Sequence, residues 1–321
     1  MSEDYSRVLV TGGAGFIGSH LVDRLLKEGF EVTVIDNLTS GNVENIAHHQ
    51  GRKEFCFTKG DIRDVSLVDE MVKDADVVFH EAAFVSAALS VENPLITNEI
   101  NVTGTLNLLK ASADLNVKRF VYASSAAVYG EASPPQKKET MAPQPTSPYA
   151  VSKLAAENYV QVFHQLYGIE TVSLRYFNVY GPRQSFDLRS AYGGVITLFI
   201  NRLLENMPPI IYGDGEQTRD FVYVHDVVDA NMLALNTARA TGEVFNIGTG
   251  RQTTINQVAE TLQNIMNRKN LKSIYSDPRP GDPRQGYANI DKAKRVLGYE
   301  PRYALQEGLS ELVQWYREKQ S

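Results

Sequence analysis

The sequence predicts an α/β fold in which a doubly wound parallel sheet is followed by a smaller C-terminal α/β region. Three observations predict this class. Short apolar runs alternate with longer helix-like segments in the first half, a glycine-rich turn joins the first apolar run to the first helix, and the rhythm changes after about residue 177. Strands buried on both faces read as continuous apolar runs, and the helices between them supply the crossovers of a parallel sheet.

The elements follow in order along the chain. The first helix is expected from about Phe16 to Lys27. The strands expected in the sheet are Val8–Val10, Glu31–Asp36, Phe55–Thr58, Asp76–His80, Arg119–Ala123 and Glu170–Arg175. This series predicts a Rossmann domain over residues 1–177.

Prolines and glycines punctuate the chain from about Asn178, and loops rich in such residues above a sheet are where binding sites are usually built. Helices are expected there at Val195–Leu204, Asp226–Thr237, Asn256–Asn267 and Gln306–Glu318. Residues 178–321 are therefore predicted to be mainly a substrate-binding region, with some segments returning to the sheet.

Composition and charge exclude several kinds of partner. The 321 residues are 43% hydrophobic, enough for a sizeable core, and 32 basic and 38 acidic side chains give a net charge of −6. This balance gives no electrostatic reason to expect nucleic acid or an anionic membrane as partner. No apolar run reaches the length of a membrane span and the N-terminus is acidic, so we expect a cytoplasmic protein.

The cysteine and the histidines suggest neither a disulfide nor a metal site. Cys56 is the single cysteine, and its apolar surroundings predict a small buried side chain. The six histidines lack the spacing of metal ligands, and the adjacent His48 and His49 suit a loop, so no metal is expected.

A glycine-rich segment, GGAGFIG at Gly12–Gly18, gives the first signal for function. Gly12 permits a tight turn, Gly15 lets the backbone approach a pyrophosphate, and Gly18 lets the helix pack on the sheet. Asp36 ends the second strand, where a carboxylate can accept both hydroxyls of an adenosine ribose. The carboxylate would repel a 2′-phosphate, so NAD is preferred over NADP.

A tyrosine and a lysine four residues apart give the second signal. Tyr149 and Lys153 would share one face of a helix that Pro148 suits as a first turn. A nearby ammonium and a positive nicotinamide ring should bring the pKa of the phenol towards neutrality, so that Tyr149 can exchange a proton with an alcohol. Ser124 and Ser125, at the carboxyl end of the fifth strand, could polarise the same hydroxyl.

The chain thereby resembles the extended short-chain dehydrogenase/reductase superfamily, and within it the UDP-sugar 4-epimerases. The resemblance extends from Arg7 to about Tyr316. Its pieces are GGAGFIG, DNL at Asp36–Leu38, GDI at Gly60–Ile62, HEAA at His80–Ala83, SSAAVYG at Ser124–Gly130, YAVSK at Tyr149–Lys153, RYFNVYGPRQ at Arg175–Gln184, GDGEQTRDFVYVHDV at Gly213–Val227, NIGTG at Asn246–Gly250 and RPGDPR at Arg279–Arg284.

The resemblance implies roles for particular residues. Ser125, rather than Ser124, is the hydroxyl-binding serine, Tyr149 is the acid/base, and Lys153 holds the nicotinamide ribose and tunes Tyr149. The other implied cofactor-binding residues are Phe16, Ile17, Asn37, Asp61, Ile62, Ala82, Ala83, Asn101 and Phe177, and the implied substrate-binding residues are Ser86, Asn178, Arg219, Arg279, Asp282 and Gly286. Arginines suit the diphosphate of a UDP-sugar because they offer paired donors.

The choice of reaction follows from Ala126 and Ala127. Relatives that dehydrate the sugar carry Asp-Glu at these two positions, and alanines cannot transfer protons. We therefore expect inversion at C4 of UDP-glucose and UDP-galactose through a 4-keto intermediate. Gly286, where relatives restricted to these two sugars carry tyrosine, also leaves room for an N-acetyl group, and Ser86 is expected to contact it.

Two alternatives remain within enzymes, a UDP-glucuronate 4-epimerase and a nucleotide-sugar 4,6-dehydratase. A third alternative is an NAD-binding redox sensor, although the intact Tyr149–Lys153 pair argues against it. The resemblance also implies a homodimer formed through helices at about Ile96–Leu115 and Pro148–Tyr167. Apolar residues of the second helix, namely Leu154, Val160, Phe163 and Leu166, could equally be ordinary core.

Overall fold

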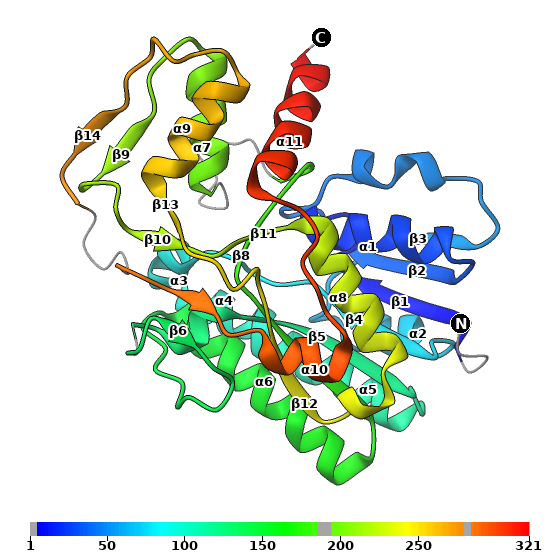
Figure 1. Ribbon diagram of the computed structural model, residues 1–321. Coiled ribbons are helices and arrows are strands. Elements are labelled where there is room, and N and C mark those ends of the chain that lie inside the picture. Colours follow the sequence, from blue (N-terminus) through cyan, green and yellow to red (C-terminus); the bar gives the residue numbers. More distant parts are fainter. Residues whose placement is uncertain (1–4, 132, 185–193, 279–283, 321) are drawn as a thin grey trace.

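A seven-stranded parallel sheet crosses the molecule in the computed structural model, which describes residues 5–131, 133–184, 194–278 and 284–320 (Figure 1). The strand order is β3-β2-β1-β4-β5-β7-β12, and all pairs are parallel. The strands are β1 (Arg7–Thr11), β2 (Glu31–Asp36), β3 (Phe55–Lys59), β4 (Val77–His80), β5 (Arg119–Ser125), β7 (Glu170–Tyr176) and β12 (Glu243–Ile247). The order reverses beside β1, and such switch points are where open parallel sheets bind ligands.

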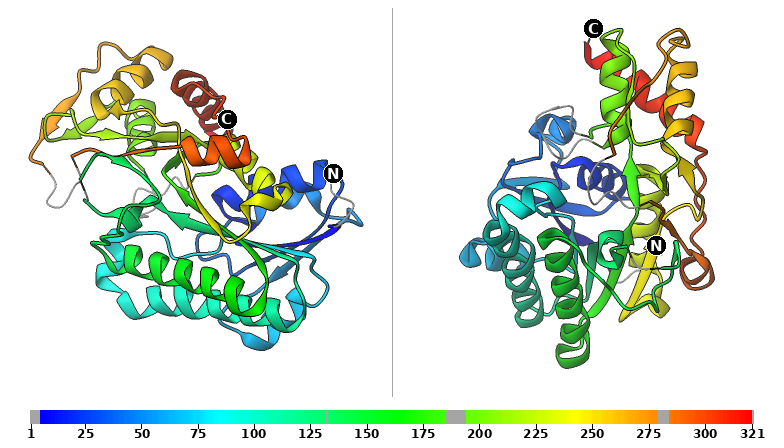
Figure 2. Two further views of the ribbon diagram at one scale, coloured as in Figure 1. Left: turned by 60° about the horizontal axis from the view of Figure 1, so that its bottom comes forward. Right: turned by 90° about the vertical axis from the view of Figure 1, so that its left-hand side faces the viewer.

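Helices cover both faces of this sheet, which confirms the doubly wound class. One face packs against α1 (Phe16–Lys27), α8 (Val224–Asn236) and α10 (Asp291–Leu297). The other face packs against α2 (Val65–Val72), α5 (Thr105–Asp114) and α6 (Pro148–Tyr167). Figure 2 shows α5 and α6 side by side along this second face.

A third apolar core lies in the C-terminal region, where α7 (Val195–Leu204), α9 (Ile255–Ile265) and α11 (Leu305–Gln320) pack together. Small two-stranded sheets connect this region to the rest. They pair β8 (Asn178–Tyr180) with β11 (Phe221–Tyr223), β9 (Ile210–Tyr212) with β14 (Ile274–Ser276), β10 (Thr218–Arg219) with β13 (Thr253–Thr254), and β6 (Gln136–Lys137) with β15 (Tyr287–Ala288).

Short helical segments complete the described chain. The α-helices are α3 (Ala87–Glu92) and α4 (Pro94–Asn98), and η3 (Glu99–Gly104) is a π-helix. The single 3₁₀ turns are η1 (Val43–Asn45), η2 (Ala47–His49), η4 (Ala126–Tyr129) and η5 (Ala238–Ala240). The helix expected over Ile96–Leu115 is therefore made of α4, η3 and α5, with the π-helical turn in its middle.

The prediction that Cys56 is buried was wrong. Cys56 is exposed on β3, the outermost strand of the sheet. Its neighbours Phe55 and Phe57 point to the opposite face and pack against the core there. Side chains alternate along a strand, so at the sheet edge one face is buried and Cys56 lies on the other.

Local sequence fixes both ends of α6, the helix that carries the Tyr149–Lys153 pair. The Ser147 side chain accepts a hydrogen bond from the Ala150 N–H, and Pro148 occupies the first turn. Gly168 ends the helix with a left-handed φ of 74°. Within the described residues, no helix is long and apolar enough to cross a membrane.

Candidate active site

The turn between β1 and α1 fits the pyrophosphate of a dinucleotide. Gly12 has a φ of +69°, and a Cβ added to it would lie 2.7 Å from the backbone nitrogen of Ala82. Gly15 caps α1 without a side-chain hydrogen bond, and the first turn of α1 holds no acidic residue. The first N–H groups of α1 and the helix dipole are therefore available to an anion.

Asp36 ends β2 beside this turn, as the sequence predicted. Its carboxylate accepts hydrogen bonds from the backbone N–H groups of Ala14, at 3.1 Å, and Leu38, at 2.8 Å. Burial raises the pKa of Asp36, and these two hydrogen bonds offset part of the increase. The carboxylate keeps acceptor capacity for the two hydroxyls of a ribose.

Asn37 and Asp61 lie next to each other beyond Asp36. The Asn37 side-chain nitrogen donates to Asp61 Oδ2 at 2.9 Å. Hydrogen bonds from Arg63 hold the pKa of Asp61 well below its usual range. Both residues line the cavity described next, at the end where Asp36 is expected to bind the adenosine ribose.

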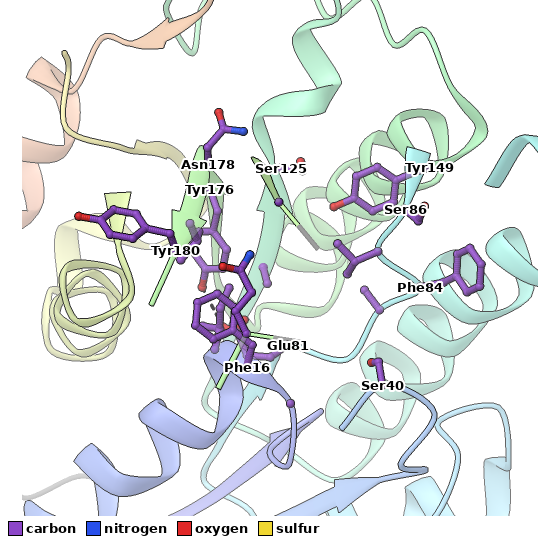
Figure 3. A pocket seen from close by; sticks show the side chains of 18 of the residues that line it. Phe16, Ser40, Glu81, Phe84, Ser86, Ser125, Tyr149, Tyr176, Asn178 and Tyr180 are labelled. Atoms are coloured by element: carbon purple, nitrogen blue, oxygen red, sulfur yellow. Dashed lines mark hydrogen bonds between the residues drawn. The ribbon is translucent and has the colours of Figure 1, made fainter. Parts of the chain in front are cut away.

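One cavity of about 680 Å³ runs from the glycine turn along the carboxyl ends of the strands to the C-terminal region. Nearly all the predicted site residues that the structure describes line it. They are Gly12, Gly15, Phe16, Ile17, Gly18, Asp36, Asn37, Asp61, Ile62, Ala82, Ala83, Ser86, Ser125, Tyr149, Lys153, Phe177, Asn178 and Arg219. Figure 3 shows Ser125, Tyr149 and Ser86 around one part of this cavity and Asn178 on another side.

The predicted trio of Ser125, Tyr149 and Lys153 comes together from β5 and α6. The Ser125 side chain hydrogen-bonds the Tyr149 side chain, and the Tyr149 hydroxyl points towards Ser125 in Figure 3. Lys153 is buried, and its Nζ donates to the Ala123 carbonyl at 2.8 Å and lies 5.1 Å from the centroid of the Tyr122 ring. The hydroxyls of Ser125 and Tyr149 and the ammonium of Lys153 therefore lie in the same part of the cavity.

Burial raises the pKa of the Tyr149 phenol in the protein alone, and the hydrogen bond with Ser125 offsets part of the increase. The lower pKa expected from the sequence also relied on the positive nicotinamide ring. Burial penalises the phenolate, so positive charge must be supplied at the site to stabilise it.

Glu81 is a site residue that sequence reasoning did not single out. It follows β4 and lines the cavity with Lys153. Burial raises its pKa to about 7, and burial lowers the pKa of Lys153 to about 8 while the charge of Glu81 opposes that decrease. Glu81 lies in the HEAA motif, but the side chains that set its environment, Tyr176 and Lys153, are distant in sequence.

Asn101 and Gly286 do not line the cavity. Asn101 is buried in η3 and accepts a hydrogen bond from the Phe84 N–H at 2.7 Å. Its side-chain nitrogen donates to the Phe84 carbonyl at 3.1 Å and to Ser152 Oγ at 2.9 Å, so it supports the cavity wall from behind. A Cβ on Gly286 would meet no atom within 4 Å. Arg279 and Asp282 lie outside the described residues.

Arg219 reaches the cavity from β10, where Asp220 fixes the surrounding loops. The Asp220 carboxylate accepts hydrogen bonds from the N–H groups of Thr249, Gly250 and Ala288, at 2.7, 2.9 and 3.0 Å. The NIGTG segment and β15 are thereby joined to the strand that carries Arg219. The sequence motif singled out Arg219 and not Asp220. Asp220 is fully buried, and its hydrogen-bond partners lie far along the chain, so its role is visible only in the structure.

Asp23, His48 and His49 form a cluster that the sequence did not predict. Both Nε2 atoms lie close to Asp23 Oδ1, at 2.9 Å for His48 and 2.7 Å for His49. The three side chains are close enough together to hold a metal ion. Arg183 donates to the other carboxylate oxygen at 2.7 Å, and its positive charge disfavours a cation there. The cluster thus joins α1 to the Arg183 loop, which lines the cavity.

The fold and the cavity define a dinucleotide-dependent enzyme of the short-chain dehydrogenase/reductase type, with a serine, a tyrosine and a lysine at the end of a Rossmann sheet. Residues 8–248 match the NAD dependent epimerase/dehydratase family. The chain belongs to this family, and its cofactor is NAD.

Relatives with assigned names agree in length and fold. A putative UDP-glucose 4-epimerase of Methanocaldococcus jannaschii is 44% identical, with 97% of this chain and 98% of the relative covered. A UDP-glucose 4-epimerase of Thermotoga maritima, solved with UDP-glucose, is 41% identical with a TM-score of 0.91, covering 98% of this chain and all of the other.

The structure of a UDP-N-acetylglucosamine 4-epimerase from Methanobrevibacter ruminantium, in complex with UDP-N-acetylmuramic acid, is also similar. It is 39% identical with a TM-score of 0.92, covering 98% of this chain and 99% of the other. The comparisons therefore establish an NAD-dependent enzyme that acts on nucleotide sugars.

Proposed function

We propose that this chain is a UDP-hexose 4-epimerase that interconverts UDP-glucose with UDP-galactose and UDP-N-acetylglucosamine with UDP-N-acetylgalactosamine. The observation that carries the proposal is the pair Ala126 and Ala127, directly after Ser125. Ala127 lines the cavity next to the serine. Methyl groups there cannot donate or accept the protons that elimination of water needs, so oxidation and reduction at C4 is the chemistry that this part of the site supports.

The residues of the chain have distinct tasks in this reaction. NAD supplies the acceptor and donor of the C4 hydride when bound. Tyr149 takes the proton of the C4 hydroxyl and returns it after the ketosugar has turned its other face. Ser125 holds the reacting oxygen, and the Lys153 ammonium stabilises the phenolate of Tyr149.

Asn178 and Arg219 support the choice of a UDP-sugar among anionic substrates. Both line the cavity on the side of the C-terminal region. An arginine can bind a diphosphate through paired donors, and an amide adds a neutral donor. The resemblance to the UDP-sugar 4-epimerases implies threonine at the position of Asn178 in members that act on UDP-glucuronate, so Asn178 favours a neutral hexose here.

A product analysis tests the proposal. Purified enzyme with NAD is incubated separately with UDP-glucose, UDP-N-acetylglucosamine, UDP-glucuronate and dTDP-glucose. The products are identified by NMR. We expect the C4 epimers of the first two sugars. A 4-keto-6-deoxy product, or turnover of UDP-glucuronate alone, would contradict the proposal.

A Tyr149→Phe variant identifies the proton-transfer residue. We expect kcat to fall about 10²–10⁴-fold, since the proton has no acceptor, while NAD content, measured on denatured protein, stays the same. Tyr167→Phe at the exposed C-terminal end of α6 is the matched control, and it should keep wild-type kcat. A redox sensor without turnover would show no activity to lose in either protein.

We further propose that the protein is a homodimer joined through α4 and α6. The outer face of α6 exposes Val151, Tyr159, Val162 and Leu166, and Leu95 of α4 is 80% exposed nearby in the fold. Val160 and Phe163 instead belong to the core, and Leu154 is partly buried. An apolar stripe on a packed pair of helices favours a copy of the same surface as its partner.

A further inference from the structure

The Glu81 carboxyl is held at the base of the cavity by a chain of hydrogen bonds that the proposed reaction does not use. The Tyr176 hydroxyl donates to Glu81 Oε1 at 2.8 Å, and Asn231 of α8 donates to the Tyr176 oxygen at 2.7 Å. Asn231 is itself fixed by donation to the Val227 carbonyl at 2.9 Å. Figure 3 shows Glu81 beside Tyr176 at the base of the cavity. Groups from β7 and α8 therefore orient this one carboxyl.

Lys153 is the positive group that faces Glu81. It comes from α6 and lines the same cavity, and its Nζ donates to the carbonyl of Ala123 at 2.8 Å. Ala123 follows Tyr122, whose partner across the sheet is His80, the residue before Glu81, so the sheet brings the two charged groups to the same place. The charge of each group accordingly raises the pKa of Lys153 and lowers that of Glu81. Ala123 supplies the one hydrogen bond to a protein acceptor described for its ammonium, which has three donors. Glu81 thus places a negative charge near an ammonium that is 3% exposed.

Among the described residues, three other groups lie around Glu81, and none of them is charged. Tyr176 from β7 is a neutral phenol, because burial raises its pKa well above the usual value. Asn231 from α8 is a neutral amide. His80, the preceding residue, is buried and neutral, since burial and the charge of Lys153 lower its pKa to about 3, and its ring nitrogens pair with Thr11 and Thr105.

We propose that Glu81 is a positioning residue whose carboxylate keeps the Lys153 ammonium protonated and so acts on Tyr149 through Lys153. The consequence for turnover depends on the proposed function, whereas the coupling between Glu81 and Lys153 does not. Because Glu81 opposes deprotonation of Lys153, removing its charge makes Lys153 lose its proton at lower pH. Activity that needs the ammonium is then lost at lower pH as well, which moves the alkaline limb of the kcat profile downwards.

The coupling is tested on Lys153 itself. Protein labelled with ¹³C at the lysine ε-carbon is titrated by NMR, and the Lys153 signal is assigned from its loss in Lys153→Met. Glu81→Gln keeps an acceptor for the Tyr176 hydroxyl but removes the charge. We expect the midpoint of the Lys153 titration to fall by about one pH unit. Glu70→Gln removes the same charge from an exposed position on α2 and should leave the midpoint unchanged.

A second variant covers the case in which Glu81→Gln does not fold. Tyr176→Phe removes the donor that helps Glu81 to ionise, so Glu81 stays protonated to higher pH. We expect a decrease of the Lys153 midpoint in the same direction but smaller. Equal midpoints in wild type and whichever variant folds would overturn the proposal.

The pH dependence of turnover completes the test. In Glu81→Gln the alkaline limb of kcat should shift down by the same amount as the NMR midpoint, with KM for the UDP-sugar unchanged. If Glu81 had only a structural role, Glu81→Gln would lower kcat at all pH values, and the alkaline limb would stay at the same pH. That result would overturn the proposal. A shifted midpoint in a protein that turns over no UDP-sugar would support the coupling and contradict the proposed function instead.

Discussion

Single residues set the chemistry of this site through their burial. In the proposed reaction Tyr149 must lose a proton at neutral pH, yet burial raises the pKa of its phenol, and the hydrogen bond with Ser125 offsets only part of that increase. Positive charge has to supply the rest, and Lys153 can do so only while it is protonated. Burial works against this too, since it lowers the pKa of Lys153 to about 8. The residues around Lys153 therefore matter as much as Tyr149 itself.

Gly286 provides a test of which sugars fit. Gly286 does not itself line the cavity, but the resemblance implies tyrosine at this position in relatives restricted to UDP-glucose and UDP-galactose. We therefore expect Gly286→Tyr to extend a ring towards the acetamide and to reduce kcat/KM for UDP-N-acetylglucosamine at least about tenfold, since one poorly fitting group costs about 1–3 kcal/mol. The same variant should turn over UDP-glucose almost normally, since a Cβ at this position meets no atom within 4 Å. The measurement is steady-state kinetics on both sugars, with Gly286→Ala as control. An equal loss on both would contradict a gating role.

The residues with local motifs could be predicted from the sequence, and those with distant partners could not. Gly12, Asp36, Tyr149 and Lys153 each stand in a spacing that the chemistry requires, and all line the cavity. Glu81 has no such pattern, because its environment is made by Tyr176 and Lys153, which reach it through the fold. Only the tertiary arrangement reveals it as a titrating group.

Helices and strands position the trio by means of a buried network behind it. Glu157, one turn after Lys153 on α6, accepts hydrogen bonds from Ser124 at 2.6 Å and from Arg175 of β7 at 3.0 and 2.5 Å. Arg175 also donates to Tyr129 at 2.8 Å. The network fixes α6 relative to the ends of β5 and β7, and hence Tyr149 relative to Ser125.

Loss of this ion pair should be costly. We expect Glu157→Gln to lower the free energy of unfolding by about 3–5 kcal/mol, because Arg175 would be left buried without its counter-charge. Urea denaturation followed by circular dichroism measures it. Asp114→Asn breaks the exposed Lys110–Asp114 pair on α5 and should leave the denaturation midpoint unchanged. Equal effects of the two variants would show that the buried pair is not special.

Long elements were readable from the sequence, whereas short ones were not. The predicted bounds of α1, α7 and β2 agree with the structure, since apolar periodicity and end residues define them. Strands of two or three residues such as β6, β10, β13 and β15 carry no periodic signal, and their partners lie far along the chain. The π-helical turn η3 was not predicted either, because its sequence reads as ordinary helix.

At the scale of the whole molecule, three apolar cores hold in place the parts of the chain that form the cavity. The two cores on either face of the sheet hold the glycine turn and the trio in place, and the third core holds the C-terminal region over them. Residues of all three cores line the cavity, among them Phe177, Ile62 and Phe199. The remaining apolar surface on α6 is then available to a second chain.

The proposed dimer is tested by charge on that surface. We expect Val162→Glu with Leu166→Glu to give a monomer, because two carboxylates would be buried at the contact without partners. Light scattering after size-exclusion chromatography gives the mass. Ile274→Glu, at an exposed apolar residue of β14, should leave the dimer intact. A wild-type protein with the mass of one chain would contradict the proposal.

Because β12 returns to the sheet, the C-terminal half of the chain supplies one strand of the N-terminal sheet. The polypeptide leaves the sheet after β7, builds part of the side of the cavity where the sugar is proposed to bind, and comes back to add the last strand beside β7. A fragment cut after residue 177 would leave that edge open to pairing with other chains and so to aggregation. Swapping sugar specificity between relatives by grafting therefore requires replacing loops within the intact chain, since the C-terminal half cannot be exchanged as a detachable module.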